Sequence, residues 1–183
     1  MLIASFMPLC WLAMMALHEV GHVLAAWCSG GTVVKVVLHP FAISRTDVSP
    51  NPRPLIVAWA GPMAGVLLPV LIGSVAYMSK SRFLYLFRFF TGFCLIANGT
   101  YIGVGSIDMV GDAGEIIRHG SPRWLLWLFG VVAVPSGFFL WHRLGSHFGL
   151  GEARGRVDVR AAYVSCCMLL VTSVVLFALS PRS

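Results

Sequence analysis

Five long runs of apolar residues restrict the fold of this chain more than any other feature of its sequence. The runs cover residues 2–28, 54–79, 83–105, 123–142 and 159–179. As an α-helix, a run of about 20 residues is long enough to cross the ~30 Å hydrocarbon core of a bilayer. Because a chain in lipid must satisfy its backbone hydrogen bonds internally, we expect each run to be a helix. The sequence therefore predicts an integral, multi-pass membrane protein.

The composition supports this expectation. Of the 183 residues, 58% are hydrophobic and 11% are charged, whereas soluble domains have about 25% charged residues. The net charge of +6 does not indicate a nucleic-acid partner, because the basic residues lie in short segments between the apolar runs, as is typical of membrane helices. The five cysteines lie in or beside the runs and form no C-x-x-C pair, so we expect no disulfide framework. The length allows a single membrane domain, residues 1–183.

Two of the connecting segments have a structure-forming pattern of their own. Residues 29–53 contain the Val-rich stretch "TVVKVVLHPFAIS", which favours strands, so we expect a short β-hairpin at the membrane surface. Residues 106–122 contain three acidic residues, and they predict one or two helical turns from about Asp112 to His119. We expect a basic loop at 143–158. The predicted fold class is an all-α membrane protein with about five transmembrane helices and a short β-hairpin between the first two.

The string "HEVGH", residues 18–22, lies inside the first apolar run. His18 and His22 are four residues apart and therefore share one face of a helix. Two imidazoles at this spacing can chelate one Zn²⁺, and Glu19 is then placed to act on a metal-bound water. A carboxylate within a membrane span costs at least ~2.5–3.5 kcal/mol on insertion scales, so such residues are rare and usually functional. A metal site is therefore favoured over a purely structural cluster of hydrogen-bonded polar residues.

A catalytic zinc site needs three protein ligands and an open position for water. The third ligand must come from another segment of the chain. His22 lies near the end of the first run, and with five helices the segment 106–122 lies on the same side of the membrane. The candidates are Asp108, Asp112, Glu115 and His119 in that segment and His39 in the hairpin.

Three motifs resemble those of the site-2 protease family of intramembrane zinc metalloproteases. The first is "HEVGH" in an early helix. The second is "AGPMAG", residues 60–65, which resembles the family's G-P-x-x-N element. The third is "GDAGEIIR", residues 111–118, which resembles the family's L-D-G-G-R-I-L run and puts the zinc-ligand aspartate on Asp112, with Asp108 as the alternative. Asn98 resembles the asparagine of the family's N-x-x-P element, which implies a hydrogen-bond donor near the scissile peptide.

The resemblance covers about residues 1–120, a metalloprotease-like core, and leaves 121–183 as two additional packing helices. The sequence departs from the family in three ways. Gly65 stands where the family usually has Asn, no Pro follows Asn98 in "NGTY", and the spacing from Asn98 to Asp112 is longer than usual. These departures leave a rival interpretation open, namely an inactive family member that acts as a scaffold or binding subunit of a membrane complex.

The resemblance implies a zinc metalloendopeptidase that cuts peptide bonds in or near transmembrane segments of other proteins. Zn²⁺ would be held by His18, His22 and Asp112, and Glu19 would act as general base. We expect a membrane-protein substrate, contact with the lipid bilayer, a regulatory membrane partner and a location in the bacterial inner membrane. Strand addition to the hairpin could bind the extended substrate. A small transporter or metal carrier is a weaker alternative, since the later runs hold few polar residues.

Overall fold

The computed structural model describes residues 2–39, 44–151 and 157–179. Within them lie five long helices, each long and apolar enough to cross a membrane. They are α1 (Leu2–Cys28), α2 (Pro54–Met78), α3 (Leu84–Asp108), α5 (Arg123–Trp141) and α6 (Val159–Leu179). Their bounds follow the five apolar runs to within a few residues, and the predicted all-α membrane fold is confirmed.

In the described residues, four short elements lie between the long helices. Strands β1 (Val33–Val37) and β2 (Arg45–Val48) pair antiparallel between α1 and α2, which confirms the predicted hairpin; residues 40–43, between the two strands, lie outside the described residues. The short helix α4 (Gly111–Arg118) confirms the predicted helical turns. The expected loop at 143–158 was wrong in one part, because the 3₁₀ helix η1 (Gly145–Phe148) forms there and ends at Gly149 in the left-handed conformation.

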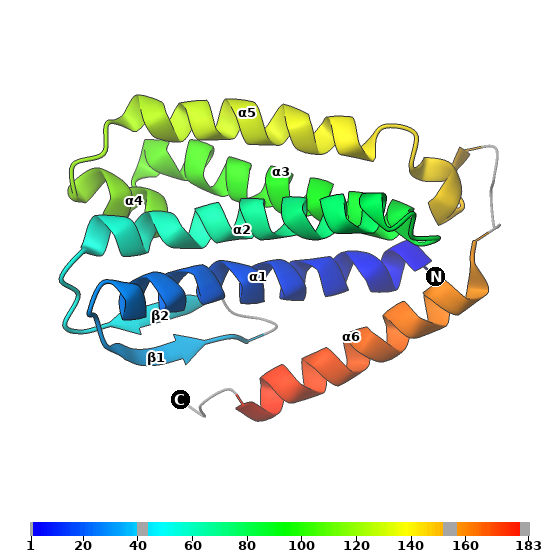
Figure 1. The fold of residues 1–183 in the computed structure, drawn as a ribbon, viewed down its shortest axis with the longest axis horizontal. Coiled ribbons are helices and arrows are strands. Elements are labelled where there is room, and N and C mark those ends of the chain that lie inside the picture. Colours follow the sequence, from blue (N-terminus) through cyan, green and yellow to red (C-terminus); the bar gives the residue numbers. More distant parts are fainter. Residues whose placement is uncertain (1, 40–43, 152–156, 180–183) are drawn as a thin grey trace.

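The long helices α1, α2, α3 and α5 lie side by side in the bundle, and α6 runs obliquely beside α1 (Figure 1). The hairpin follows α1 and α4 follows α3, so both lie at the same end of the bundle (Figure 1). This arrangement brings the segment 106–122 to the same end of the bundle as the carboxyl-terminal end of α1, as the sequence predicts. It also places α4 against α2 and α3, close to the carboxyl-terminal half of α1.

Helices α3 and α5 meet through small residues. A Cβ atom on Gly137 of α5 would lie 2.7 Å from the carbonyl oxygen of Gly92 on α3, and one on Gly130 would lie 2.9 Å from the carbonyl oxygen of Gly99. In lipid, small residues at a helix contact let the two backbones approach closely and gain van der Waals energy. The α3–α5 contact is therefore a backbone-to-backbone contact.

The turn between α3 and α4 fixes the direction of the short helix. Met109 ends α3 in the left-handed conformation with φ 54°, and Gly111 follows with φ 51°. The N–H of Val110 donates to the carbonyl of Gly105 at 3.1 Å, which closes the end of α3. Two left-handed residues within three reverse the chain, so that Asp112, in the first turn of α4, faces α1.

Candidate metal centre

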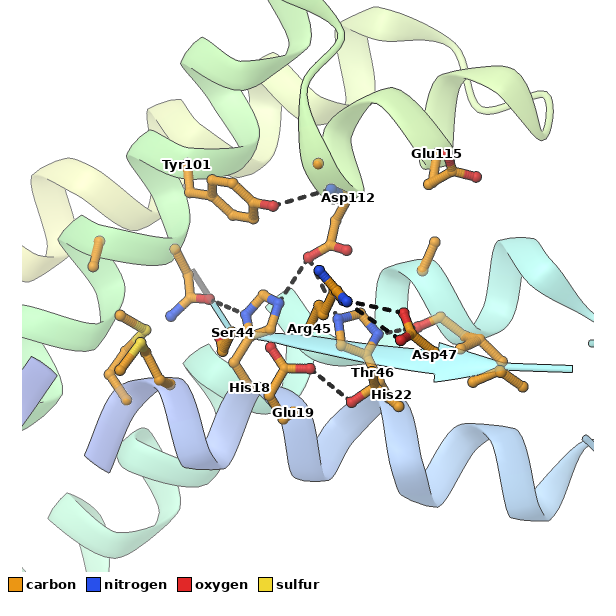
Figure 2. A pocket seen from close by; sticks show the side chains of 18 of the residues that line it. His18, Glu19, His22, Ser44, Arg45, Thr46, Asp47, Tyr101, Asp112 and Glu115 are labelled. Atoms are coloured by element: carbon orange, nitrogen blue, oxygen red, sulfur yellow. Dashed lines mark hydrogen bonds and ion pairs between the residues drawn. The ribbon is translucent and has the colours of Figure 1, made fainter. Parts of the chain in front are cut away.

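Three side chains from α1 and α4 converge on one point (Figure 2). The Nε2 atom of His18 lies 2.7 Å from Oδ2 of Asp112, and the Nε2 atom of His22 lies 3.4 Å from the same oxygen. Zinc bonds of 2.0–2.2 Å in a tetrahedral site separate the ligand atoms by ~3.3 Å. The three side chains thus need only a small outward movement to hold one zinc ion between them.

The other ring nitrogen of each histidine has a protein partner. Nδ1 of His22 donates to the carbonyl oxygen of Val57 at 2.7 Å, and Nδ1 of His18 donates to Oδ1 of Asn98 at 2.8 Å. A carbonyl oxygen can only accept, so Nδ1 carries the hydrogen and Nε2 can present a lone pair. The Nε2 atom of His18 and Oδ2 of Asp112 lie 2.7 Å apart. At this distance, two atoms that both carry lone pairs need a proton or a cation between them. Metal-ligating histidines commonly have such Nδ1 partners, which fix the ring orientation.

Gly61 gives the two imidazoles their space. A Cβ atom on this residue of α2 would overlap the ring of His22 and would lie 2.7 Å from Nε2 of His18. Small residues such as those of "AGPMAG" commonly permit the close packing of membrane helices. The structure adds a second reason for a small residue here, because α2 passes directly beside the atoms that would bind the metal.

Glu19 is buried beside the histidines, with 2% of its surface exposed. Its Oε2 accepts a hydrogen bond of 2.7 Å from the hydroxyl of Thr46 on β2, and Figure 2 shows the two side chains pointing toward each other. The potential ligand atoms of His18, Glu19 and His22 lie within 4.8 Å of one another. Glu19 is therefore next to the candidate metal position, and one strand of the hairpin holds its carboxylate.

Sequence reasoning missed Thr46. Its neighbours Arg45 and Asp47 form an ion pair with each other, at 3.4 Å, and both side chains are about half exposed. Successive side chains on a strand point to opposite faces. The alternation of charged and uncharged residues in "RTDV" therefore indicates that Thr46 points to the face opposite to Arg45 and Asp47. It does not indicate which side chain Thr46 contacts.

The other candidates for the third ligand lie away from the two imidazoles. Asp108 is exposed at the end of α3. Glu115 and His119 are exposed on α4 at the rim of the site, where Nε2 of His119 lies 3.4 Å from the carboxylate of Glu115. The ring of His39 lies against the carboxyl-terminal part of α6. Among the described residues, Asp112 is the candidate whose carboxylate reaches both imidazoles.

The environment of Asp112 favours its ionised form. Burial by itself would raise the pKa of this carboxyl, but the contacts and positive charge of His18 and His22 hold the pKa well below its usual range. Asp112 also lies in the first turn of α4, where the helix dipole stabilises a negative charge. A metal ligand must be deprotonated, and Asp112 meets this requirement.

The amide of Asn98 makes contacts that differ from the role that the family resemblance implies. Only 2% of its surface is exposed, and its Nδ2 donates to the carbonyl oxygens of Cys94, at 3.0 Å, and Gly65, at 3.3 Å. Both amide hydrogens are thus engaged, which leaves none for a substrate. A Cβ atom on Gly65 would lie 2.6 Å from Oδ1 of Asn98, so the departure at Gly65 makes room for this amide. In the structure Asn98 orients His18.

The site opens into a pocket of about 1100 Å³. This volume is larger than the ~300–1,000 Å³ of typical small-molecule sites. The lining extends along α1 from His22 to Trp11 and includes Met14 and Met15, and the residues of β2 also belong to it. The pocket therefore joins the polar cluster to an apolar surface within the membrane span.

The chain matches the family model described as Peptidase M50B-like over residues 4–111. The searches of curated proteins and of solved structures found no match. The matched region covers more than half of the chain and includes His18, Glu19, His22 and Asn98. The resemblance that the motifs carry is thereby confirmed. This chain belongs to the Peptidase M50B-like family, a family of membrane metalloproteases.

Proposed function

We propose that this protein is a zinc-dependent intramembrane endopeptidase that hydrolyses peptide bonds in or near the membrane spans of other proteins. The observation that carries the proposal is the convergence of His18, His22 and Asp112 on one point within the bundle, with the carboxylate of Glu19 beside it. The family shows that the protein is related to membrane metalloproteases. Zinc binding and catalysis by this chain are what we propose in addition.

The donor set suits zinc. Two neutral imidazoles and one carboxylate are a known ligand set of catalytic zinc sites, which keep a fourth position open. When bound, the zinc ion would polarise the scissile carbonyl and lower the pKa of a coordinated water. His18, His22 and Asp112 would hold it, while Asn98 and Val57 keep the two rings in the required orientation.

Glu19 has the position of a general base. It would take a proton from the attacking water and then deliver it to the leaving amine. Its burial keeps bulk water away from the carboxylate, and the hydrogen bond from Thr46 selects one orientation of that carboxylate. Thr46 would therefore position Glu19 and also tie the hairpin to the reactive part of the site.

We propose that the pocket binds an extended apolar segment rather than an intact helix. An unwound segment in the membrane needs hydrogen-bond partners for its backbone, and the free edge of a strand can supply them by strand addition. The sequence pattern assigned this role to the hairpin as a whole, because of its Val-rich stretch. In the structure, residues 44–48 line the pocket, so β2 is the strand next to the site. We propose that the substrate backbone pairs with this strand.

The first test combines zinc content with proteolysis. Detergent-purified protein is analysed for zinc by mass spectrometry and is incubated with a library of single-span peptides in lipid nanodiscs. We expect about one zinc per chain and cleavage by the wild type. Glu19→Gln should keep the zinc and lose cleavage by ~10²–10⁴-fold, the usual contribution of a general base. Asp112→Ala should lose the zinc, and Asp108→Ala, the matched control, should keep it.

The departures from the family motif at Gly65 and after Asn98 favour a second candidate, a non-proteolytic family member that serves as a scaffold in a membrane complex. A well-folded wild type without zinc, or a Glu19→Gln variant that performs the cellular role unchanged, would support the scaffold. The five spans and the family indicate an integral multi-pass membrane protein. A bacterial inner membrane as its location and a regulatory membrane partner belong to the proposal.

A further inference from the structure

We propose that Tyr101 is a catalytic residue, whose hydroxyl donates a hydrogen bond to the carbonyl oxygen of the scissile peptide bond. The inference rests on the proposed proteolytic function. It gives a chemical role to a residue that stands at one of the departures from the family pattern. In "NGTY", residues 98–101, Tyr101 occupies the position that is Pro in the family's N-x-x-P element.

The position of Tyr101 on α3 directs it to the site. Residues three apart in a helix share a face, so Tyr101 points to the same side of α3 as Asn98, which contacts His18. The rings of Tyr101 and His18 lie edge to face with their centroids 6.0 Å apart. Tyr101 also lines the pocket that contains Glu19 and Asp112. The phenol thus stands beside the candidate metal position.

The hydroxyl of Tyr101 is held in place but keeps its hydrogen. Its oxygen accepts a hydrogen bond of 3.1 Å from the backbone N–H of Asp112 (Figure 2). Because an N–H group cannot accept, the hydrogen of the hydroxyl must find another partner. Among the residues that the structure describes, no side chain or carbonyl accepts it. The hydrogen is therefore available to a ligand in the pocket.

The chain makes room for this hydroxyl. A Cβ atom on Gly111 would overlap the phenol oxygen of Tyr101, and Gly111 also has φ 51°. A side chain at position 111 is therefore excluded on two independent grounds. The turn that directs Asp112 toward α1 is also the turn that leaves space for the tyrosine hydroxyl.

The obvious alternative donors are already engaged. Both amide hydrogens of Asn98 bond to backbone carbonyls, and the hydroxyl of Thr46 donates to Glu19. A pocket that hydrolyses an amide gains most from a fixed donor aimed at the oxygen on which negative charge develops. Tyr101 therefore supplies the fixed hydrogen-bond donor that Asn98, whose amide hydrogens are both engaged, cannot supply.

The proposed step needs no further reactant. The oxygen of water adds to the carbonyl carbon while Glu19 takes the proton, and the carbonyl oxygen gains negative charge. Tyr101 donates a hydrogen bond to that oxygen and keeps its own proton. The C–N bond then breaks, and the proton on Glu19 goes to the leaving amine. The products are one carboxylic acid, which keeps the second hydrogen of the water, and one amine, and nothing is oxidised or reduced.

The test uses Tyr101→Phe, which removes the hydroxyl and keeps the ring. The purified zinc-loaded protein is assayed with a peptide that the wild type cleaves. Loss of one oxyanion donor typically lowers kcat by ~10²–10³-fold, and we expect this loss with little change in KM. A phosphinic peptide that mimics the tetrahedral state should bind more weakly by a similar factor in calorimetry. Zinc affinity, measured by chelator competition, should stay unchanged.

Tyr85→Phe is the matched control. Tyr85 lies 16 residues earlier on the same helix, ~24 Å away along its axis, and its buried hydroxyl has no hydrogen-bond partner among the residues that the structure describes. This variant should cleave like the wild type. A Tyr101→Phe protein that cleaves and binds the phosphinic peptide like the wild type would overturn the inference alone. A parallel loss of zinc affinity would also overturn it, because Tyr101 would then only position Asp112. A wild type that binds zinc but cleaves nothing would refute the proposed function itself.

Discussion

Glycine lies at several helix contacts in the part of the chain that the structure describes, and the space left by the missing side chain is filled differently at Gly137 and at Gly61. Between α3 and α5, the atom facing Gly137 is a backbone carbonyl oxygen, that of Gly92. Between α1 and α2, the atoms facing Gly61 are the imidazole nitrogens of His18 and His22. A small residue in a membrane span can therefore serve either the packing of backbones or the placement of reactive side chains. The neighbouring atoms decide which of the two a substitution damages.

The largest effect is expected for Gly61→Ala. The added methyl group would collide with ring ends rather than with backbone, so the imidazoles have to move while the helices stay in place. We expect zinc affinity and cleavage to fall by ~100-fold or more, at or beyond the upper end of the effect of disturbing the partners of metal ligands. The melting temperature of the apoprotein in detergent should stay within a few degrees of the wild type. Undiminished zinc affinity would show that the rings do not bind metal at this place.

Gly137→Ala should show the opposite behaviour. The methyl group would meet the carbonyl of Gly92 and the side chain of Ile96, so α5 must shift away from α3. Overpacking of this kind costs ~1–3 kcal/mol, and it should appear as reduced resistance to unfolding in a denaturing-detergent titration. Zinc content per folded molecule should not change. If Gly137→Ala lost zinc but kept its stability, the α3–α5 contact would not differ from the α1–α2 contact in the way described.

A smaller effect is expected for Gly65→Ala, which tests whether Asn98 orients His18. The methyl group would approach the amide of Asn98, at 2.6 Å from its Oδ1, and would displace the acceptor of the His18 Nδ1–H group. We expect zinc affinity to fall by ~10-fold, at the low end for such partners. Asn98→Ala should lose a similar amount, and the double variant should lose no more than the larger single loss, because both changes remove one interaction. Additive losses would mean that Gly65 acts independently of Asn98.

The smallest effect is expected for Gly103→Ala, a control on the α3–α5 contact. Its nearest neighbour would be the Cα of Gly130 at 3.4 Å, an ordinary van der Waals distance. Alanine is favoured over glycine in a helix interior by up to ~1 kcal/mol, so stability should be unchanged or slightly increased. If Gly103→Ala lost as much stability as Gly137→Ala, α3 and α5 would have to lie closer together at Gly103 than the 3.4 Å distance indicates.

The features that depend on local sequence were predictable. The spans follow from the length of each apolar run, and His18, Glu19 and His22 follow from one helical turn. The choice between Asp108 and Asp112 depends on the left-handed conformations of Met109 and Gly111, which turn the second carboxylate toward α1 and leave the first exposed. The alignment of the "GDAGEIIR" motif also selected Asp112, without knowledge of these backbone conformations. The spacing of residues alone did not decide between the two.

The features that depend on contacts between distant segments were not predictable. Thr46 reaches Glu19 across 27 positions of sequence, and nothing in the strand pattern names its partner. The role of Asn98 changed because a sequence does not show which amide hydrogens are already engaged. In the sequence, Tyr101 was noticeable only because it stands where the family's N-x-x-P element has a proline. The division into a core, residues 1–120, and two packing helices stays a prediction.

The depth of the histidines along α1 has a consequence for the products of the proposed reaction. His18 and His22 lie ten and six residues before the last residue of the helix, Cys28, which is ~15 and ~9 Å from its hairpin end. A bond cut at this depth would divide a span of ~20 residues into two pieces, and neither piece would be long enough to cross the ~30 Å hydrocarbon core. Cleavage would thus remove the anchor itself and free the substrate's attached domain from the bilayer.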